Sequence, residues 1–277
     1  MVDHAHNLRA SFNIPTAGKK IKPIGVITRG TTGVNRLRRF DRWCFHHDRV
    51  RSLVAGSGSG SGTLALDVGY GASHTTTVEW GRWLHRLDSK MRVVGLEINP
   101  ERVLPAQGGV SFELGGFELA GYQPQLVRAF NVLRQYDVEQ VADAWNTVTS
   151  RLAPGGLFFE GTCDEIGRRC SWITLDATGP VTLTLAWDPW GVEKPSDVAE
   201  RLPKVLIHRN VPGEKIHSLL AAADAAWDYS AGWEPYGPRV RWEKARLMLV
   251  EQGWPIEIPR RRVGDCLLTV PWDVVAP

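Results

Sequence analysis

The stretch LALDVGYGASHTTTVEWGRWL, from Leu64 to Leu84, decides the fold. It opens with a short apolar run that is typical of a buried strand, and Gly69 and Gly71 follow at once. Apolar side chains then recur at the i, i+3, i+4 and i+7 spacing of one helix face: Trp80, Trp83, Leu84 and Leu87. Glycines at the turn admit backbone angles and a close ligand approach that other residues prevent. The stretch therefore predicts a strand, a ligand-binding turn and a helix over 75–87.

Further strands and helices alternate after this unit. Apolar runs predict strands at 92–98, 110–114, 124–133 and 156–162. A helix is predicted over 138–152, where Asp137 and Gln140 suit a capping box. Such alternation over about 100 residues is typical of right-handed βαβ units. We predict an α/β protein with a doubly wound, Rossmann-like, mostly parallel sheet and helices on both faces.

The second half of the chain follows a different pattern. Residues 171–176 and 181–187 predict a hairpin, followed by helices at 213–228 and 239–252 and a last strand at 266–272. We therefore divide the chain into a basic N-terminal arm or lid (1–55), a Gly/Ser linker (56–62), a core (63–165) and a C-terminal α+β extension that completes the fold (166–277).

Composition narrows the class of protein. Of the 277 residues, 43% are hydrophobic and 23% charged, as expected for a globular chain. No apolar run reaches the eighteen or more residues of a membrane helix, and the N-terminus lacks a basic and apolar leader, so we expect a cytoplasmic protein without membrane contact. The four cysteines lie far apart and form no CxxC pair, which indicates neither a disulfide framework nor a metal site.

The N-terminal arm carries an excess of positive charge. Residues 1–55 contain eleven Lys or Arg and three acids, a net +8, so the remainder of the +3 chain carries −5. Such an arm can bind nucleic-acid phosphates, pair with its own acidic remainder, or close over a ligand as a lid. The lid is favoured because four apolar residues recur every third position, as on a helix with one buried face: Val34, Leu37, Phe40 and Trp43.

The glycine turn admits two ligand classes, dinucleotides and S-adenosylmethionine (SAM). A dinucleotide fingerprint needs a third glycine where this chain has His74, whereas Asp67 supplies a carboxylate that suits the ammonium group of SAM. The segment LDVGYGAS resembles the acid-x-Gly-x-Gly motif of class I SAM-dependent methyltransferases. The whole chain is similar to uncharacterised actinobacterial methylase-like proteins.

The resemblance continues in the order of the family's later motifs. It implies that Glu97 binds the ribose hydroxyls, that Gly116, Phe117 and Glu118 lie against the adenine, and that LVRAFNVLRQY and LAPGGLFFEGT correspond to the fourth and fifth strands. Other roles stay open: Asp67 as a turn acid, Glu97 as a surface acid and Phe117 as core. The cofactor residues implied are Asp67, Gly69, Tyr70, Gly71, Glu97, Ile98, Gly116, Phe117, Glu118 and Asn131.

The function expected from this resemblance is methyl transfer from SAM to an unidentified acceptor, a small molecule or RNA. Positioning supplies most of the catalysis, and a general base helps when the acceptor must lose a proton. Asp164 and Glu165, in EGTCDEIGRR, are the candidate catalytic residues. The alternative is a nucleic-acid-binding protein that keeps the fold without turnover, and an NAD-dependent dehydrogenase ranks third. The oligomeric state is left open.

Overall fold

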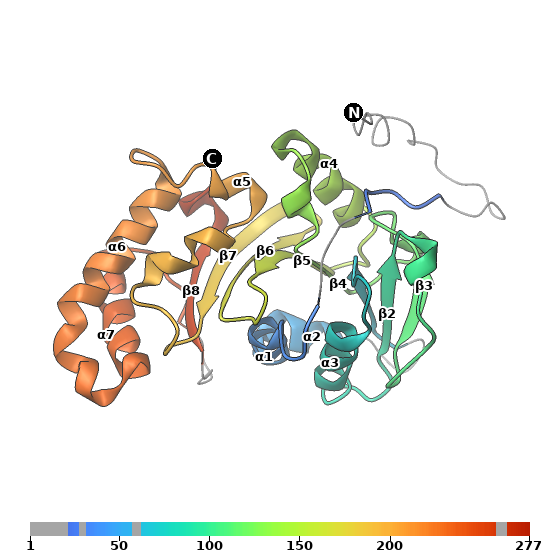
Figure 1. Cartoon of the computed structure of the whole chain (residues 1–277), viewed down its shortest axis with the longest axis horizontal. Coiled ribbons are helices and arrows are strands. Elements are labelled where there is room, and N and C mark those ends of the chain that lie inside the picture. The colour runs from blue at the N-terminus through green and yellow to red at the C-terminus, as the bar shows by residue number, and fades with distance from the viewer. Residues whose placement is uncertain (1–21, 28–31, 57–61, 259–264) are drawn as a thin grey trace.

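The structure is a computed structural model that describes residues 22–27, 32–56, 62–258 and 265–277. Its centre is an eight-stranded sheet in the order β3-β2-β1-β4-β5-β6-β7-β8 (Figure 1). The strands are β1 (Leu64–Val68), β2 (Arg92–Glu97), β3 (Ser111–Leu114), β4 (Leu126–Phe130), β5 (Leu157–Cys163), β6 (Arg169–Asp176), β7 (Gly179–Trp187) and β8 (Cys266–Pro271).

Two kinds of pairing divide the sheet. Strands β1 to β5 are parallel, and the strand order reverses between β1 and β4. Strands β6, β7 and β8 extend the sheet in antiparallel pairs, as the hairpin signal predicted. The predicted α/β fold is confirmed, and the parallel half has the order of a doubly wound sheet, in which ligands bind beyond the carboxyl ends of the strands at the reversal.

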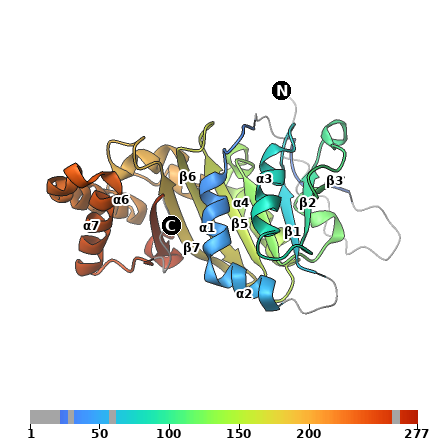
Figure 2. The ribbon, with the colours of Figure 1, turned by 90° about the horizontal axis from the view of Figure 1, so that it is seen from below.

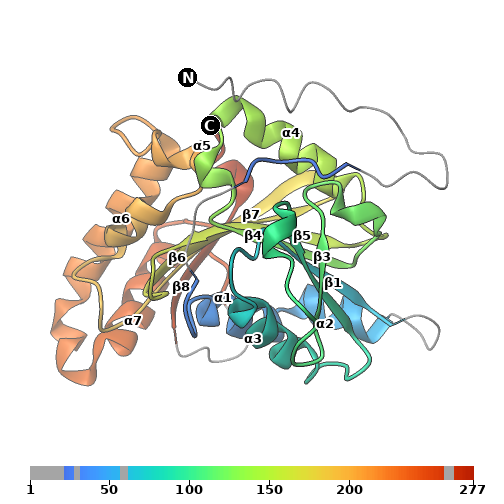
Figure 3. The ribbon, with the colours of Figure 1, turned by 45° about the vertical axis from the view of Figure 1, so that its right-hand side comes forward.

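Helices cover both faces of the sheet. Helices α1 (Arg38–His46), α2 (Asp48–Gly56) and α3 (Thr75–Leu84) lie on one face, where Figure 2 shows α1 and α3 in front of the strands. Helices α4 (Val138–Thr149), α5 (Lys204–Ile207), α6 (Lys215–Tyr229) and α7 (Pro238–Glu251) pack on the other face, and Figure 3 shows α4 opposite α1 and α3. The short α5 and the 3-10 helix η5 (Pro195–Arg201) were not predicted.

The described part of the arm belongs to this packed structure. Helix α1 begins at Arg38, so the helix predicted from Val34 starts four residues too early, and Val34 is 73% exposed. Leu37, Phe40 and Trp43 are buried against the sheet as the spacing predicted. Three arginines of the arm pair with acids of the C-terminal half: Arg39 with Asp188 and Asp265, Arg42 with Asp265, and Arg49 with Asp176.

A buried charge cluster ties α1 to the sheet. The guanidinium of Arg128, in β4, donates to Asp41 at 2.8 Å and to Asp67 at 2.7 Å. It also lies 4.4 Å from the ring centroid of Trp80, and all three charged side chains are buried. Burial raises the pKa of Asp41 to about 7, even though Arg128 acts in the opposite direction. Three elements, α1, β1 and β4, thus meet at one arginine.

A second buried acid, Glu160 in β5, has no such partner. Both of its carboxylate oxygens are buried without a hydrogen bond to any part of the chain that the structure describes. Burial raises the pKa of Glu160 to about 8. The side chain is therefore mostly protonated at neutral pH.

The described residues cover the predicted divisions of the chain only in part. Most of the Gly/Ser linker, residues 57–61, lies outside the described residues, as do the first 21 residues of the arm. Across the described ranges, no helix is long and apolar enough to cross a bilayer.

Candidate cofactor and substrate site

The turn after β1 lies at the reversal of strand order and adopts angles that favour glycine. Gly69 and Gly71 have φ of 72° and 82°. The N–H of Gly69 donates to the carbonyl of Leu96 at 2.8 Å, which fixes the turn against β2. A Cβ at Gly69 would lie 2.7 Å from Val132 Cγ2, so the position has no room for a side chain. The turn therefore brings bare backbone to the carboxyl edge of the sheet.

Glu97 ends β2 beside this turn. Its side chain is buried, Oε2 accepts from the N–H of Gly71 at 3.1 Å, and Oε1 accepts from the N–H of Asn99 at 3.0 Å. A carboxylate oxygen can accept more than one hydrogen bond, so each oxygen keeps capacity for a further donor. The pair of bonds fixes the orientation of the Glu97 carboxylate beside the glycine turn.

A small cavity of about 20 Å³ lies between Glu97 and the loop after β3. It is lined by Ile98, Gly116 and Phe117, together with Tyr136 and the segment 24–26. Phe117 is buried, so it serves both as core and as wall.

The segment 24–26 crosses this cavity and is held by hydrogen bonds. Ile24 O accepts from Phe117 N at 2.9 Å, and the N–H of Val26 donates to Tyr136 Oη at 2.6 Å. Glu118 accepts from the N–H groups of Ile24 and Gly116, so its carboxylate holds the segment and the loop together. The segment 24–26 therefore has to shift before the small cavity can accept an aromatic ring of a ligand.

A larger cavity of about 350 Å³ opens on the other side of the glycine turn. Its walls come from the arm, the turn after β1, the segment after β4, the β5–β6 turn and η5. The lining residues are Thr32, Arg36, Leu37, Asp67, Gly69, Tyr70, Gly71, Thr76, Phe130, Asn131, Arg134, Gln135, Glu165 and Arg201.

Asp67 lines this cavity, but its carboxylate is already engaged. Oδ2 accepts from Thr77 Oγ1 at 2.8 Å and from Arg128 at 2.7 Å. Arg128 is shared between Asp67 and Asp41, so it balances one of two carboxylates, and the expected pairing of Asp67 with a ligand ammonium stays a prediction. The turn-acid role fits the geometry.

Two further predicted cofactor residues are fixed by the backbone. Tyr70 Oη donates to the carbonyl of Arg102 at 2.8 Å, which orients the ring at the cavity wall. Asn131 has φ of 61°, and its Oδ1 accepts from the N–H of Cys163 at 3.0 Å. A hydrogen bond from Cys170, with Arg36 and Asn131 nearby, lowers the pKa of the buried Cys163. Asn131 thus joins the ends of β4 and β5 at the cavity.

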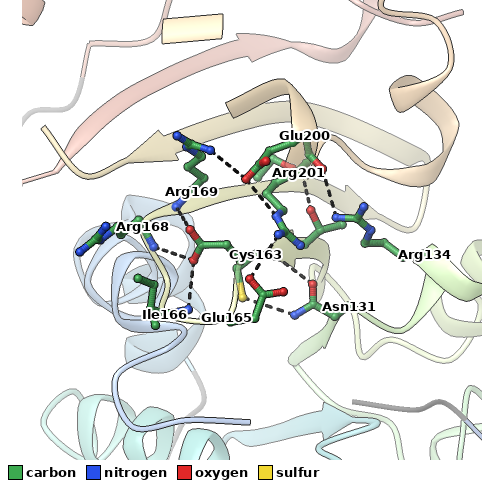
Figure 4. Close-up of polar contacts among 12 residues, drawn as sticks. Asn131, Arg134, Cys163, Glu165, Ile166, Arg168, Arg169, Glu200 and Arg201 are labelled. Atoms are coloured by element: carbon green, nitrogen blue, oxygen red, sulfur yellow. Dashed lines mark hydrogen bonds and ion pairs between the residues drawn. The ribbon is translucent and has the colours of Figure 1, made fainter. Parts of the chain in front are cut away.

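The two candidate catalytic acids occupy different environments, and Figure 4 shows Glu165 beside Arg201. The carboxylate of Asp164 accepts from the N–H groups of Ile166, Arg168 and Arg169 at 2.8–3.3 Å, so it shapes the β5–β6 turn and does not line the cavity. Glu165 lines the cavity with a side chain that is 70% exposed, and lies 3.3 Å from Arg201. Of this pair, Glu165 alone lines the cavity.

Sequence reasoning missed the arginines of the cavity. Arg134 follows Asn131 in the segment after β4 and could have been found from that position. Arg201 lies in η5, far along the chain from β5, and Arg36 donates to the carbonyls of Cys163 and Asp164 at 3.4 and 2.9 Å. Sequence spacing places neither of these two at the cavity. No group of His, Cys, Asp and Glu suited to a metal occurs in the ranges that the structure describes.

Known protein structures resemble this chain over part of its length. No family model and no curated protein matches it. Among solved structures, the cyclopropane synthase MmaA2 of Mycobacterium tuberculosis is 19% identical, with a TM-score of 0.29 over 40% of this chain and 41% of that one. The plantazolicin methyltransferase BpumL, in complex with SAH, is 10% identical, with a TM-score of 0.33 over 46% and 48%. The magnesium protoporphyrin IX methyltransferase of Synechocystis, with bound SAH, is 18% identical, with a TM-score of 0.30 over 48% and 62%. The chain thus spans less than two thirds of the length of each.

Proposed function

We propose that the protein is a SAM-dependent methyltransferase. The observation that supports this most directly is the junction of the Gly69–Gly71 turn with Glu97 at the reversal of strand order. A buried carboxylate with spare acceptor capacity suits the two hydroxyls of a ribose, and the bare turn suits close contact with a bulky ligand. The motif resemblance of LDVGYGAS points to the same ligand.

The residues around this junction fit SAM in parts. Glu97 would hold the ribose. Ile98 and Phe117 would flank the adenine once the segment 24–26 shifts. Gly69 and Asn131 would border the methionine end of SAM beside the larger cavity. When bound, SAM supplies a methyl group on a positively charged sulfur. Neither Asp67 nor Glu118 is assigned to SAM here, because Arg128 and backbone N–H groups engage them.

The larger cavity would hold the methyl acceptor. Its volume of about 350 Å³ is in the range of small-molecule sites. Glu165 is the acid placed to assist an acceptor that must lose a proton, and the other walls position the acceptor beside the glycine turn.

Calorimetry with SAM, its demethylated product S-adenosylhomocysteine (SAH) and NAD tests the proposal. We expect SAM and SAH to bind and to raise the melting temperature, since a ligand of the folded state stabilises it by RT ln(1 + [L]/Kd). NAD should leave both measurements unchanged. Stabilisation by NAD alone would favour the dehydrogenase, and no SAM binding at millimolar ligand would exclude the methyltransferase.

Replacing Glu97 tests the ribose contact. Glu97→Ala removes two acceptors for ligand hydroxyls, and hydrogen bonds to a charged group contribute about 1.5–3 kcal/mol each, so SAM affinity should fall at least about tenfold. Glu101→Ala, an exposed acid nearby that does not line either cavity, is the matched control and should leave affinity unchanged. Equal SAM affinity for the two folded variants would mean that Glu97 has no contact with the ligand.

The nucleic-acid-binding alternative receives no specific support. Three arginines of the arm, Arg39, Arg42 and Arg49, form ion pairs with acids of the same chain. Arg39 is also buried. These charges serve the fold, and RNA stays a possible acceptor class only through the larger cavity.

A further inference from the structure

Two arginines from distant parts of the chain converge on the larger cavity (Figure 4). Arg134 lies in the 3-10 turn η4 (Leu133–Gln135) after β4, and Arg201 ends η5. The hydroxyls of Thr162 and Ser171 both donate to the carbonyl of Arg201, which fixes its backbone to β5 and β6. The fold thus holds the base of the Arg201 side chain firmly at the cavity.

The two positive charges are only weakly compensated. Arg134 donates to the carbonyl of Glu200 at 3.2 Å, and no carboxylate in the described ranges forms an ion pair with it. Burial, followed by the charge of Arg201, lowers the pKa of Arg134. Arg201 lies 3.3 Å from Glu165 and 3.4 Å from Glu200, but these two acid side chains are 70% and 47% exposed, and exposed ion pairs contribute little. A ligand anion can therefore replace Glu165 at Arg201.

Guanidinium groups match the geometry of carboxylate and phosphate oxygens, often through two parallel hydrogen bonds. We propose that Arg134 and Arg201 bind an oxyanion, a carboxylate or a phosphate, carried by the methyl acceptor. The identification of the ligand as a methyl acceptor rests on the proposed function. The binding of an oxyanion rests on the two arginines alone.

The carboxylate of SAM itself is a second source of the same chemistry. Arg134 follows β4 and Arg201 is anchored to β5 and β6, whereas Glu97, the ribose residue proposed above, lies at the end of β2. This separation favours the acceptor. Occupying the cofactor site with SAH distinguishes the two sources, because only an acceptor site stays open when SAH is bound.

The test uses three fluorinated probes with the full-length protein, detected by ¹⁹F NMR relaxation: 4-fluorobenzoate, 4-fluorophenyl phosphate and the neutral 4-fluorobenzamide. We expect one or both anions to bind with and without SAH, and at least tenfold more tightly than the amide. Binding of the benzoate alone identifies a carboxylate, and binding of the phosphate ester alone identifies a phosphate.

Variants assign the binding to these side chains. Arg134→Gln with Arg201→Gln should weaken the bound anion at least tenfold, and Glu165→Gln should tighten it, because a competing negative charge is removed. Arg168→Gln is the matched control: it removes the same charge from the β5–β6 turn but lies outside the cavity lining, so affinity should stay within twofold.

Several outcomes would overturn the inference. They are no binding of either anion, equal binding of the amide, an affinity that the double variant leaves unchanged, or displacement of the anions by SAH, which would assign the arginines to the cofactor. Arginine-dependent anion binding by a protein that binds neither SAM nor SAH would keep the oxyanion site and reject the proposed function.

Discussion

Arg128→Met will lower the free energy of unfolding by about 3–5 kcal/mol, because it leaves two buried acids without their cation. Asp41 and Asp67 both depend on this guanidinium, at 2.8 and 2.7 Å, and neither is exposed to water. Methionine fills much of the volume of the arginine side chain. The loss of stability is therefore caused by the lost charge pairing more than by a cavity. Urea unfolding followed by circular dichroism measures the change.

Two further variants make this result interpretable. Arg169→Met removes a half-exposed arginine whose ion pair with the exposed Glu200 contributes little, and it should cost less than about 1 kcal/mol. Asp41→Asn removes one acid and should destabilise by about 1–3 kcal/mol, which stays measurable if the Arg128 variant does not fold. A loss under 1 kcal/mol for Arg128→Met would contradict the role given to the cluster.

Glu160→Gln will change the pH dependence of stability. The pKa of Glu160 is about 8 in the folded protein, against an ordinary value of 4.5. Below pH 4.5 both folded and unfolded states are protonated, and as pH rises the unfolded state releases the proton while the folded state retains it up to about pH 8. The wild type therefore loses stability with rising pH, whereas glutamine does not titrate.

The measurement is the difference in unfolding free energy between Glu160→Gln and wild type at pH 5.5 and 7.5. One pKa unit corresponds to about 1.4 kcal/mol, so the difference should shift by about 3 kcal/mol in favour of the variant over these two pH units. Asp41, whose raised pKa acts in the same direction, is common to both proteins and cancels. A difference that stays constant with pH would show that Glu160 is ionised in the fold.

The parallel half of the fold was predictable because its signals are local. Each of β1 to β5 is a short apolar run, and Gly69, Gly71 and the cap at Gln140, which accepts from the N–H of Asp137, mark where elements change. The start of α1 was missed because Val34 continues the apolar spacing of Leu37 and Phe40, although it lies in the turn before the helix. Spacing alone does not report which apolar residue reaches the sheet.

The candidate site was predictable only where motif and strand end coincide. Glu97 and Gly71, which the sequence assigns to one ligand, are joined by a hydrogen bond, and their ligand stays a prediction. The ion pair of Asp67 with Arg128 could not be predicted, because cross-strand pairing of β1 with β4 depends on the order of the strands in space. The position of Arg201 could not be predicted for the same reason, because η5 reaches the cavity through contacts with Thr162 and Ser171 that no local sequence pattern encodes.

The docking of α1 also sets an order of assembly during synthesis. Its Asp41 pairs with an arginine 87 residues later, and its Arg42 pairs with an aspartate 223 residues later. A ribosome adds about 5–20 residues per second, so β4 follows α1 by roughly 4–17 seconds and β8 follows later still. During that interval Phe40 and Trp43 have no sheet to cover. Helix α1 thus finds its place only after the central strands have left the exit tunnel, and until then the nascent chain exposes an apolar helix face.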